Sequence, residues 1–266
     1  MPARSFAAEA VVLDTQDHGE ADLIVTFLSL ERGRATGIAK GAKRSKRRFV
    51  NKLEIFSFLH LTCSESTASS LLFIHEAELH SSFLHLRTDP ALYLTASVIR
   101  EVLLLAMKEG ERDADIFRLA LWALHGLDEG RPSLPLLALF LLKFYSGIGY
   151  RPELQACITC GQEVAPAREF TFSHLGGGLI CPTCTAASGS PGTRLSPGTI
   201  RIMQSAQDLP LDKLHRLVLS GPMLDQCLTA LHQYGRHLFQ RDLHAWALLE
   251  PYGKQRQKTA AAADQR

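Results

Sequence analysis

Short apolar runs typical of β-strands fill the first part of the chain. They are rich in β-branched and aromatic residues, and turn-forming pieces such as residues 17–19 and 31–33 separate them. The runs span residues 10–13, 23–28, 36–39, 53–61 and 71–77. Five strands in about 80 residues, with no long helical period between them, predict a small barrel of the oligonucleotide/oligosaccharide-binding (OB) type.

A helical period replaces the strand pattern after residue 82. Apolar side chains recur at helical spacing in residues 92–106 and again in residues 116–127. The next helix carries Pro135 in its first turn, where a missing N–H costs nothing, and ends near Gly147. Because this helix is apolar nearly all round, it is predicted to be the buried centre of a helical domain. A last helical pattern covers residues 223–249.

These elements predict an α+β protein, in which a five-stranded OB-type barrel precedes a helical domain that carries a cysteine-rich module. The predicted divisions are 1–80 for the barrel, 81–152 and 193–250 for the two parts of the helical domain, and 153–192 for the module. The tail, residues 251–266, is charged and Ala-rich and has little to bury, so it is predicted to be disordered.

Four of the six cysteines form two pairs of the pattern Cys-x2-Cys, with twenty residues between the pairs. They are Cys157, Cys160, Cys181 and Cys184. Two tight knuckles of this spacing can present four thiolates to one tetrahedral Zn²⁺. Between the pairs, residues 170–172 and 176–180 indicate a hairpin of zinc-ribbon type. Since four thiolates close the coordination shell, the pattern predicts one structural zinc ion.

Other chemistry is possible for cysteines in such pairs. A redox-active Cys-x-x-Cys usually begins a helix in a thioredoxin-like βαβ context, which this sequence lacks. An iron–sulfur cluster also takes four thiolates, although its usual spacings differ. Redox chemistry and another metal therefore stay as alternatives to zinc. Cys63 and Cys227 stand alone in apolar pattern and are predicted to be core residues.

Nothing in the sequence indicates export or membrane insertion. Residues 1–16 lack the apolar run of a signal peptide, and the most apolar stretch, 134–142, is well short of the ~20 residues that span a bilayer. The chain is therefore predicted to be cytoplasmic and to have no membrane partner. Disulfides are disfavoured in that compartment, which strengthens the metal interpretation of the cysteines.

Basic residues are concentrated in one segment, residues 32–52, although the net charge of the whole chain is only +2. This basic segment contains no acidic residue, and its cations are Arg32, Arg34, Lys40, Lys43, Arg44, Lys46, Arg47, Arg48 and Lys52. Such close positive charges repel one another unless a polyanion neutralises them. The segment bridges two strands of the predicted barrel, and Phe49 is predicted to stack on a base. The sequence thus predicts nucleic-acid binding here, against the alternative of a solvated loop.

A second, weaker basic set lies late in the chain. It comprises Arg236, Arg241, Lys254, Arg256 and Lys258, with His237 and His244 among them. These residues either extend the same electrostatic surface or form a solvated face. The sequence does not favour one of these interpretations over the other.

The common catalytic motifs are absent from the sequence. There is no Gly-Lys-Ser/Thr phosphate loop, no Gly-x-Gly-x-x-Gly, no His-Glu-x-x-His and no Gly-x-Ser-x-Gly. His60, His75 and His80 fall in strand pattern and are predicted to be surface or core residues rather than ligands. The chain is therefore predicted not to be an enzyme. The alternative is a zinc-ribbon enzyme that modifies RNA or DNA with an unrecognised active site.

Several short motifs occur in an order that resembles one known family. They are GEAD at 19–22, AKGAKRSK at 39–46, GIGYRPEL at 147–154 and GGGLIC at 176–181, the last two flanking the first cysteine pair. Together they resemble the RecO family of DNA repair proteins, from about residue 5 to residue 250. The resemblance implies an OB barrel and a helical domain that contains a zinc module. It also implies that the zinc is structural, because some family members lack the cysteines.

The resemblance also implies a function. RecO-like proteins are recombination mediators that have no ATPase activity, bind single- and double-stranded DNA and anneal complementary strands. Their implied partners are RecR and the C-terminal tail of single-stranded-DNA-binding protein (SSB). Through these partners RecA is loaded, indirectly, onto SSB-coated DNA in the bacterial nucleoid. The need for RecF is left open.

Overall fold

The computed structural model describes residues 5–65, 70–165, 168–189, 191–219 and 221–249. The predicted disordered tail at 251–266 lies outside this part of the chain, and so do Lys254, Arg256 and Lys258 of the weaker basic set. The chain divides into two compact units. The first unit is Met1–Asp89 with Leu103–Asp128, and the second is Pro90–Val102 with Glu129–Arg266. The divisions drawn from the sequence at residues 80, 152 and 192 stay a prediction.

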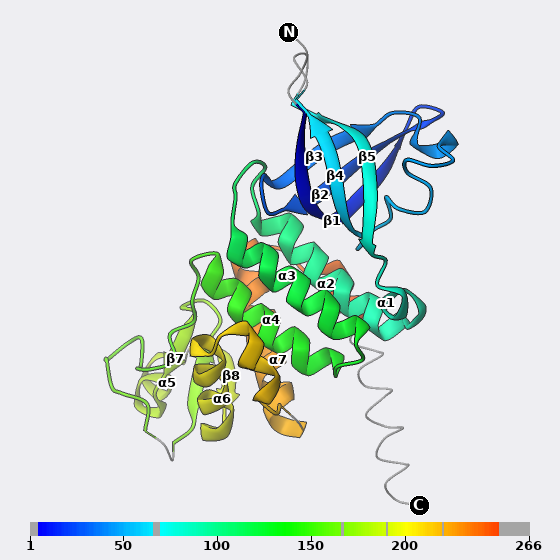
Figure 1. The fold of residues 1–266 in the computed structure, drawn as a ribbon. Helices are drawn as coiled ribbons and strands as arrows, with labels where there is room; N and C mark the ends of the chain where they lie inside the picture. Colours follow the sequence, from blue (N-terminus) through cyan, green and yellow to red (C-terminus); the bar gives the residue numbers. More distant parts are fainter. Residues whose placement is uncertain (1–4, 66–69, 166–167, 190, 220, 250–266) are drawn as a thin grey trace, which may run out of the picture. The chain divides into compact units, whose positions relative to one another are not determined.

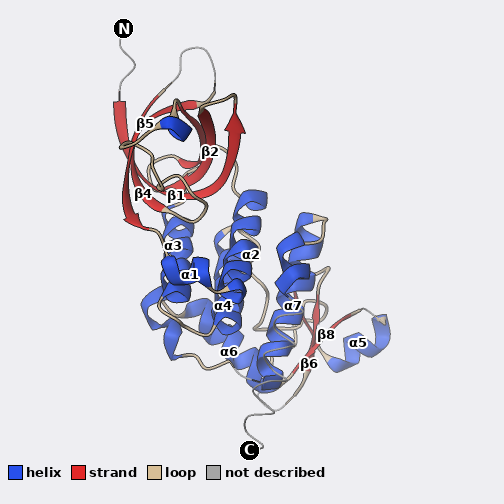
Figure 2. Cartoon of the chain, turned by 90° about the vertical axis from the view of Figure 1, so that its right-hand side faces the viewer, coloured by secondary structure: helices blue, strands red, loops and turns tan. Residues whose placement is uncertain are grey.

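Five strands close into a barrel in the first unit (Figure 1). They are β1 (Ser5–His18), β2 (Asp22–Ser29), β3 (Gly33–Ala39), β4 (Phe58–Ser64) and β5 (Leu72–Ser81), in the order β1-β2-β3-β5-β4. All neighbours pair antiparallel except β3 and β5, which are parallel. Figure 2 shows the strands curving round a ring. The predicted α+β class with an N-terminal five-stranded barrel is confirmed.

Alternating apolar side chains fill the barrel. Inward-facing residues such as Val25, Phe27 and Leu61 are fully buried, while Ile24, Thr26 and Thr62 beside them are half-buried. This period of two is what the sequence pattern detects. Cys63 belongs to the same core, and Cys227 is buried in the second unit, so both are core residues as predicted.

The connection between β3 and β4, residues 40–57, differs from the prediction in its second half. Residues 53–57 form turns and bends instead of the start of a strand, and a short 3₁₀ turn, η1 (Ala42–Arg44), opens the connection. Phe56 has φ of 72° and is buried, and its N–H donates to Val12 O at 2.8 Å. In α1 (Leu84–Thr88), the Arg87 guanidinium donates to Ile55 O at 2.8 Å. The buried apolar residues of this segment therefore attach a loop to the barrel and do not extend a strand.

Helices complete both units. The first unit contains α1, α3 (Ala114–Asp128) and the end of α2 (Pro90–Ala106). The second contains the rest of α2, α4 (Ser133–Gly147), α6 (Pro197–Asp208), η2 (Leu211–Arg216) and α7 (Gly221–Phe239). Among the described residues, no helix combines the length and the apolar character needed to cross a membrane.

Helix α4 is the core of the second unit. Its residues Leu137, Phe140, Phe144 and Tyr145 are fully buried, and it packs against α6 and α7. Tyr145 OH donates to Leu231 O of α7 at 3.2 Å, which satisfies a hydroxyl that would otherwise be buried without a partner. The predicted central helix, apolar nearly all round, is thus confirmed.

The last predicted helix, 223–249, is interrupted. Helix α7 ends at Phe239, because Gln240 takes a left-handed conformation with φ of 52°. Residues 244–249 then form a separate helical turn. Glu101 of α2 caps this turn, since its two carboxylate oxygens accept the backbone N–H groups of His244 and Ala245, each at 2.8 Å. A long-range cap of this kind leaves no local signal in the sequence.

Candidate metal centre and nucleic-acid interface

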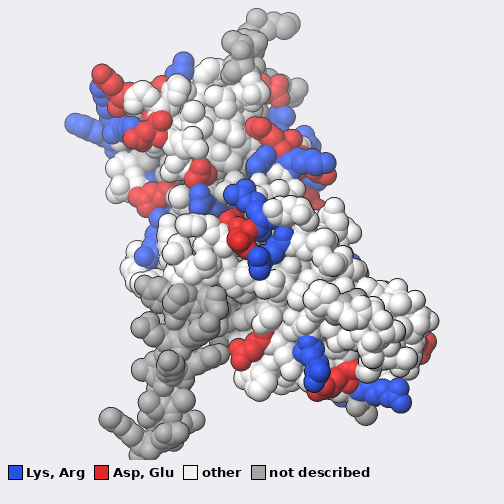
Figure 3. Space-filling model, turned by 180° about the vertical axis from the view of Figure 1, so that it is seen from behind, with Lys and Arg blue, Asp and Glu red and all other residues white. Residues whose placement is uncertain are grey.

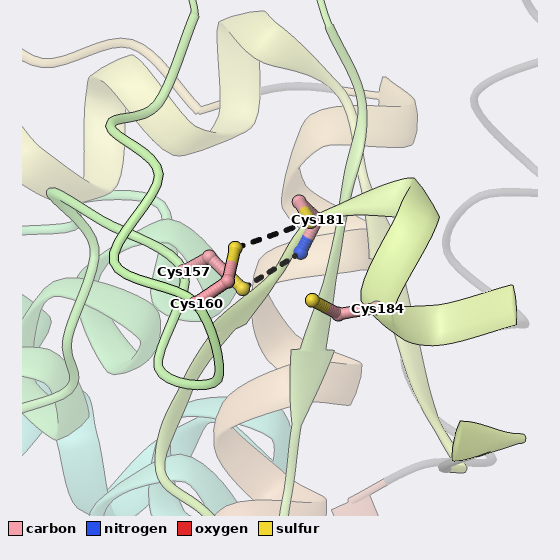
Figure 4. A group of neighbouring side chains, drawn as sticks. All are labelled: Cys157, Cys160, Cys181 and Cys184. Atoms are coloured by element: carbon pink, nitrogen blue, oxygen red, sulfur yellow. Dashed lines mark hydrogen bonds between the residues drawn. The ribbon is translucent and has the colours of Figure 1, made fainter. Parts of the chain in front are cut away.

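The four paired cysteines lie in a small module of the second unit. It contains β6 (Phe170–Ser173), β7 (Gly178–Ile180), α5 (Pro182–Ser188) and β8 (Gly192–Leu195), with sheet order β7-β6-β8. The predicted hairpin is β6–β7, and β8 is a strand that the sequence pattern missed. One cysteine pair precedes β6, and the other spans the end of β7 and the first turn of α5 (Figure 4).

The four sulfur atoms converge on one point. All lie within 4.8 Å of one another, and the Sγ atoms of Cys160 and Cys181 are 3.8 Å apart. Ligands at Zn–S distances of ~2.3 Å in a tetrahedron are ~3.8 Å from each other. Figure 4 shows the side chains directed toward one another from two sides. The residues therefore fit a four-coordinate metal ion, as the spacing predicts.

Hydrogen bonds from backbone N–H groups favour the thiolate form of Cys157. Burial alone would raise the pKa of Cys157, but N–H groups of Cys181, Cys160 and Thr159 donate to its sulfur and bring the pKa down to about 6. The thiolate is the form that binds metal. Gly161 has φ of 75° and donates its N–H to Cys157 O at 2.8 Å, which closes the first knuckle.

The module is fastened to α7 through Tyr234. A side chain at Gly177 would meet the Tyr234 hydroxyl at 2.6 Å, so the glycine allows the hairpin to approach the ring closely. Tyr234 packs edge-on against Phe172 of β6, and its hydroxyl donates to Tyr150 O at 3.2 Å. Order in the module and packing of the second unit are therefore coupled.

The basic segment lies in the first unit, and the structure divides its nine cations into two groups. Three of these cations are half-buried and bind other groups of the same unit. Arg34 donates to Leu104 O at 3.1 Å, Lys52 donates to Ala77 O at 2.7 Å, and Arg32 pairs with Glu65 at 3.0 Å. The six exposed cations lie on the β3–β4 connection within residues 40–48: Lys40, Lys43, Arg44, Lys46, Arg47 and Arg48.

Acidic residues in and next to the β1–β2 turn, which the sequence analysis did not connect with this segment, lie beside it. Lys43 pairs with Asp17 at 2.7 Å, and Arg44 pairs with Glu20 at 3.0 Å. The Gly41 N–H donates to Asp22 Oδ1 at 2.8 Å, so the GEAD and AKGA motifs are in direct contact. On the face seen in Figure 3, basic and acidic side chains of the barrel unit are interspersed. Lys46 and Arg47 form no ion pair within the described residues.

The prediction that Phe49 stacks on a base is wrong. Its ring is only 4% exposed and belongs to the barrel core, together with Ala42 and Leu53. The hydroxyl of Ser45 accepts the Phe49 N–H at 3.2 Å, which turns the chain so that the ring points inward. The Arg48 guanidinium covers the ring at 5.1 Å from its centroid. Phe49 therefore anchors this part of the connection in the barrel core and contacts one cation, Arg48.

Neutralising the acids beside the basic segment should tighten DNA binding. In Asp17→Asn/Glu20→Gln, Lys43 and Arg44 no longer have carboxylates that compete with phosphates, and we expect about two- to fivefold higher affinity for single-stranded DNA. Fluorescence anisotropy with a labelled oligonucleotide measures this. Asp115→Asn, which removes an exposed partner of Arg118 on α3, is the control. Unchanged or weaker binding by the double variant would contradict the expectation.

The fold and these sites define a barrel-and-helix protein with a four-cysteine module and a cation-rich barrel connection. Two family models cover nearly all of the chain: Recombination protein O N terminal matches residues 3–83, and Recombination protein O C terminal matches residues 87–247. The chain belongs to the RecO family of DNA repair proteins. The resemblance seen in its short motifs is thus confirmed.

Curated relatives agree with this assignment. The DNA repair protein RecO of Syntrophobacter fumaroxidans is 31% identical over 247 residues, which cover 93% of this chain and 98% of that protein. RecO of Symbiobacterium thermophilum is 31% identical, covering 86% of this chain and 90% of its own. RecO of Anaeromyxobacter sp. (strain K) is 32% identical, covering 91% and 95%. Membership of this family supports a recombination function in DNA repair.

Proposed function

We propose that this chain is a non-catalytic recombination mediator that binds single- and double-stranded DNA and anneals complementary strands. The observation that carries the proposal is the group of six exposed cations within residues 40–48. The strand order β1-β2-β3-β5-β4 supports an OB-type barrel, in which loops commonly bind nucleic acid. Contacts from Lys and Arg to phosphates carry no sequence information, which suits a protein that acts on any strand.

Annealing follows from the same electrostatics. Two DNA strands repel each other through their phosphates, and a positive surface that holds both lowers this repulsion. It also raises the local concentration of each strand near the other. Because neither effect requires a bond to be made or broken, the proposed activity needs no catalytic residue.

For the four cysteines we propose one structural Zn²⁺. Four thiolates at tetrahedral spacing suit zinc and leave no position for substrate. The contact of Tyr234 with the hairpin at Gly177 supports a bracing role within the second unit. When bound, the ion would cross-link the two cysteine pairs and would take no part in a reaction on DNA.

The proposed partners are RecR and the C-terminal tail of SSB, with RecA loaded indirectly onto SSB-coated DNA in the bacterial cytoplasm. A hollow of about 450 Å³ between α7 and the cysteine module supports the SSB contact. Arg241 and Arg236, which pairs with Asp242 in the same lining, contribute positive charge, and the exposed side chain of Leu175 contributes an apolar surface. An acidic peptide with an apolar end has complementary chemistry to such a hollow.

Annealing of complementary strands that have been coated with SSB tests the proposed function. We expect the protein to accelerate annealing, and the acceleration to fall steeply with salt because phosphate contacts release counterions. Uncoated strands serve as the control that separates SSB contact from annealing itself. No acceleration of either substrate across a salt series would favour the alternative, an enzyme acting on nucleic acid.

A further inference from the structure

Three potential metal ligands meet on the outside of the barrel, on a surface with no part in the proposed DNA contacts. They are Glu9 of β1, His60 of β4 and His80 of β5. Glu9 Oε1 is 2.6 Å from His60 Nδ1, and Glu9 Oε2 is 2.9 Å from His80 Nε2. All three side chains are between 31% and 43% exposed, so an ion from solution can reach them.

The strand pairing brings these residues together in a defined way. Glu9 and His60 are direct cross-strand partners between β1 and β4. His80 has no such partner, because β4 pairs Phe58 with Ser81 and Leu59 with Leu79, which leaves His80 as the extra residue of a β-bulge. Bulges re-aim side chains and are over-represented beside functional sites. Here the bulge lets an imidazole of β5 reach a carboxylate two strands away.

Neighbouring side chains position the three residues, and neighbouring carboxylates add negative charge around them. The ring of Phe58 lies 4.9 Å from that of His80 and fixes its position. Glu78 is the cross-strand partner of His60 on its other side, and Glu31 accepts the Glu9 N–H at 2.9 Å. Three carboxylates thus surround two imidazoles, and this charge favours a cation at the centre.

We propose that Glu9, His60 and His80 bind a divalent transition-metal ion of the zinc type. The three ligand atoms lie within 4.8 Å of one another. At metal–ligand distances of ~2.0–2.1 Å, tetrahedral neighbours are ~3.3 Å apart, so the contacts of Glu9 with His60 and His80 need to open by about 0.7 Å and about 0.4 Å. Imidazole with carboxylate is a ligand set of zinc, nickel, copper and iron sites.

This site differs in kind from the four-cysteine centre. Three protein ligands leave at least one position for water, so the ion is exchangeable, whereas four thiolates close the shell. The competing interpretation of the cluster is a carboxylate that merely hydrogen-bonds two histidines. The two interpretations differ in one measurable respect, which is the uptake of a metal ion beyond the one at the cysteines.

Cobalt titration of the full chain, with its cysteine site already loaded with zinc, tests the proposal. Calorimetry should show one further Co²⁺ bound, and absorption should show weak visible bands without the intense thiolate-to-cobalt transitions of a cysteine site. In Glu9→Gln and in His80→Ala we expect the affinity for this ion to fall at least about tenfold. His75→Ala is the matched control, because His75 is on the same strand but contacts Ser64 Oγ, at 2.7 Å.

Uptake lost in both ligand variants and kept in His75→Ala would establish the site. No uptake by the wild-type chain, or equal uptake by Glu9→Gln, would overturn the proposal. Glu9→Gln changes neither the length nor the shape of the side chain, so it gives an answer even where His80→Ala alters the bulge. Melting curves of each variant without added cobalt verify that the barrel is folded.

Discussion

Cys157→Ser should melt the second unit at a temperature roughly 10 °C lower than the wild-type chain does. Removing one of four thiolates weakens the metal site, and the folding free energy that the metal contributes is lost with it. We expect a loss on the order of 4 kcal/mol, within the range expected when a structural metal is removed. Thermal unfolding followed by circular dichroism, with metal content measured on the same samples, tests this.

The controls separate loss of metal from loss of a buried thiol. Cys227→Ser also buries a hydroxyl in the apolar core of the second unit and should lose stability, yet it should keep the metal. A strong chelator should lower the melting temperature of the wild-type chain and leave that of Cys157→Ser unchanged. Wild-type protein that holds no metal, or whose melting curve is indifferent to the chelator, would show that the cysteines have another role.

Local patterns in the sequence account for most of the barrel and for the cysteine site. Alternation places Val25 and Phe27 inward on β2, because a strand turns successive side chains to opposite faces. The cysteine pairs are local for a similar reason, since each knuckle needs only four consecutive residues. The hairpin between them is short, so its partner strands are also close in sequence. Features of this kind need no knowledge of the fold.

The errors arise where distant parts of the chain decide the local structure. Residues 53–57 have a strand-like composition, but the hydrogen bond from Phe56 N–H to Val12 O and the contacts of Arg87 hold them in a loop. After the break at Phe239, the turn at residues 244–249 is capped by Glu101, more than a hundred residues earlier in the chain. Neither contact can be inferred from the residues around the break.

The same limit applies to the candidate sites. Phe49 lies in a run of cations, which suggested an exposed ring. Burial of the ring in the adjacent barrel interior removes apolar surface from water, and this stabilises the inward orientation. Glu9, His60 and His80 come from three strands, and a bulge sets the last of them, so no spacing along the sequence indicates a ligand set. Motif searches find sites built from neighbouring residues and miss those built by strand pairing.

Replacing Lys43, Arg44, Arg47 and Arg48 by alanine should weaken binding to single-stranded DNA on the order of 100-fold at about 0.1 M salt. Each lost phosphate contact removes roughly 0.7 from the slope of log K against log salt, so the slope itself should become shallower. All four residues lie on the surface of the β3–β4 connection, although the Lys43 side chain is partly covered through its ion pair with Asp17. Measuring anisotropy over a salt series gives both quantities, and the slope identifies the loss as electrostatic.

Charge-matched and fold-matched controls make this result specific. Four surface arginines in ion pairs elsewhere, changed together to alanine, remove the same net charge: Arg118, Arg131, Arg151 and Arg194. That variant should bind DNA nearly as the wild type does. Arg48 also covers Phe49, so a triple variant that keeps Arg48 guards against loss of packing and should still lose about three contacts. If both charge-removing variants showed the same affinity and slope, DNA binding would depend on total charge, and the basic segment would have no special part in it.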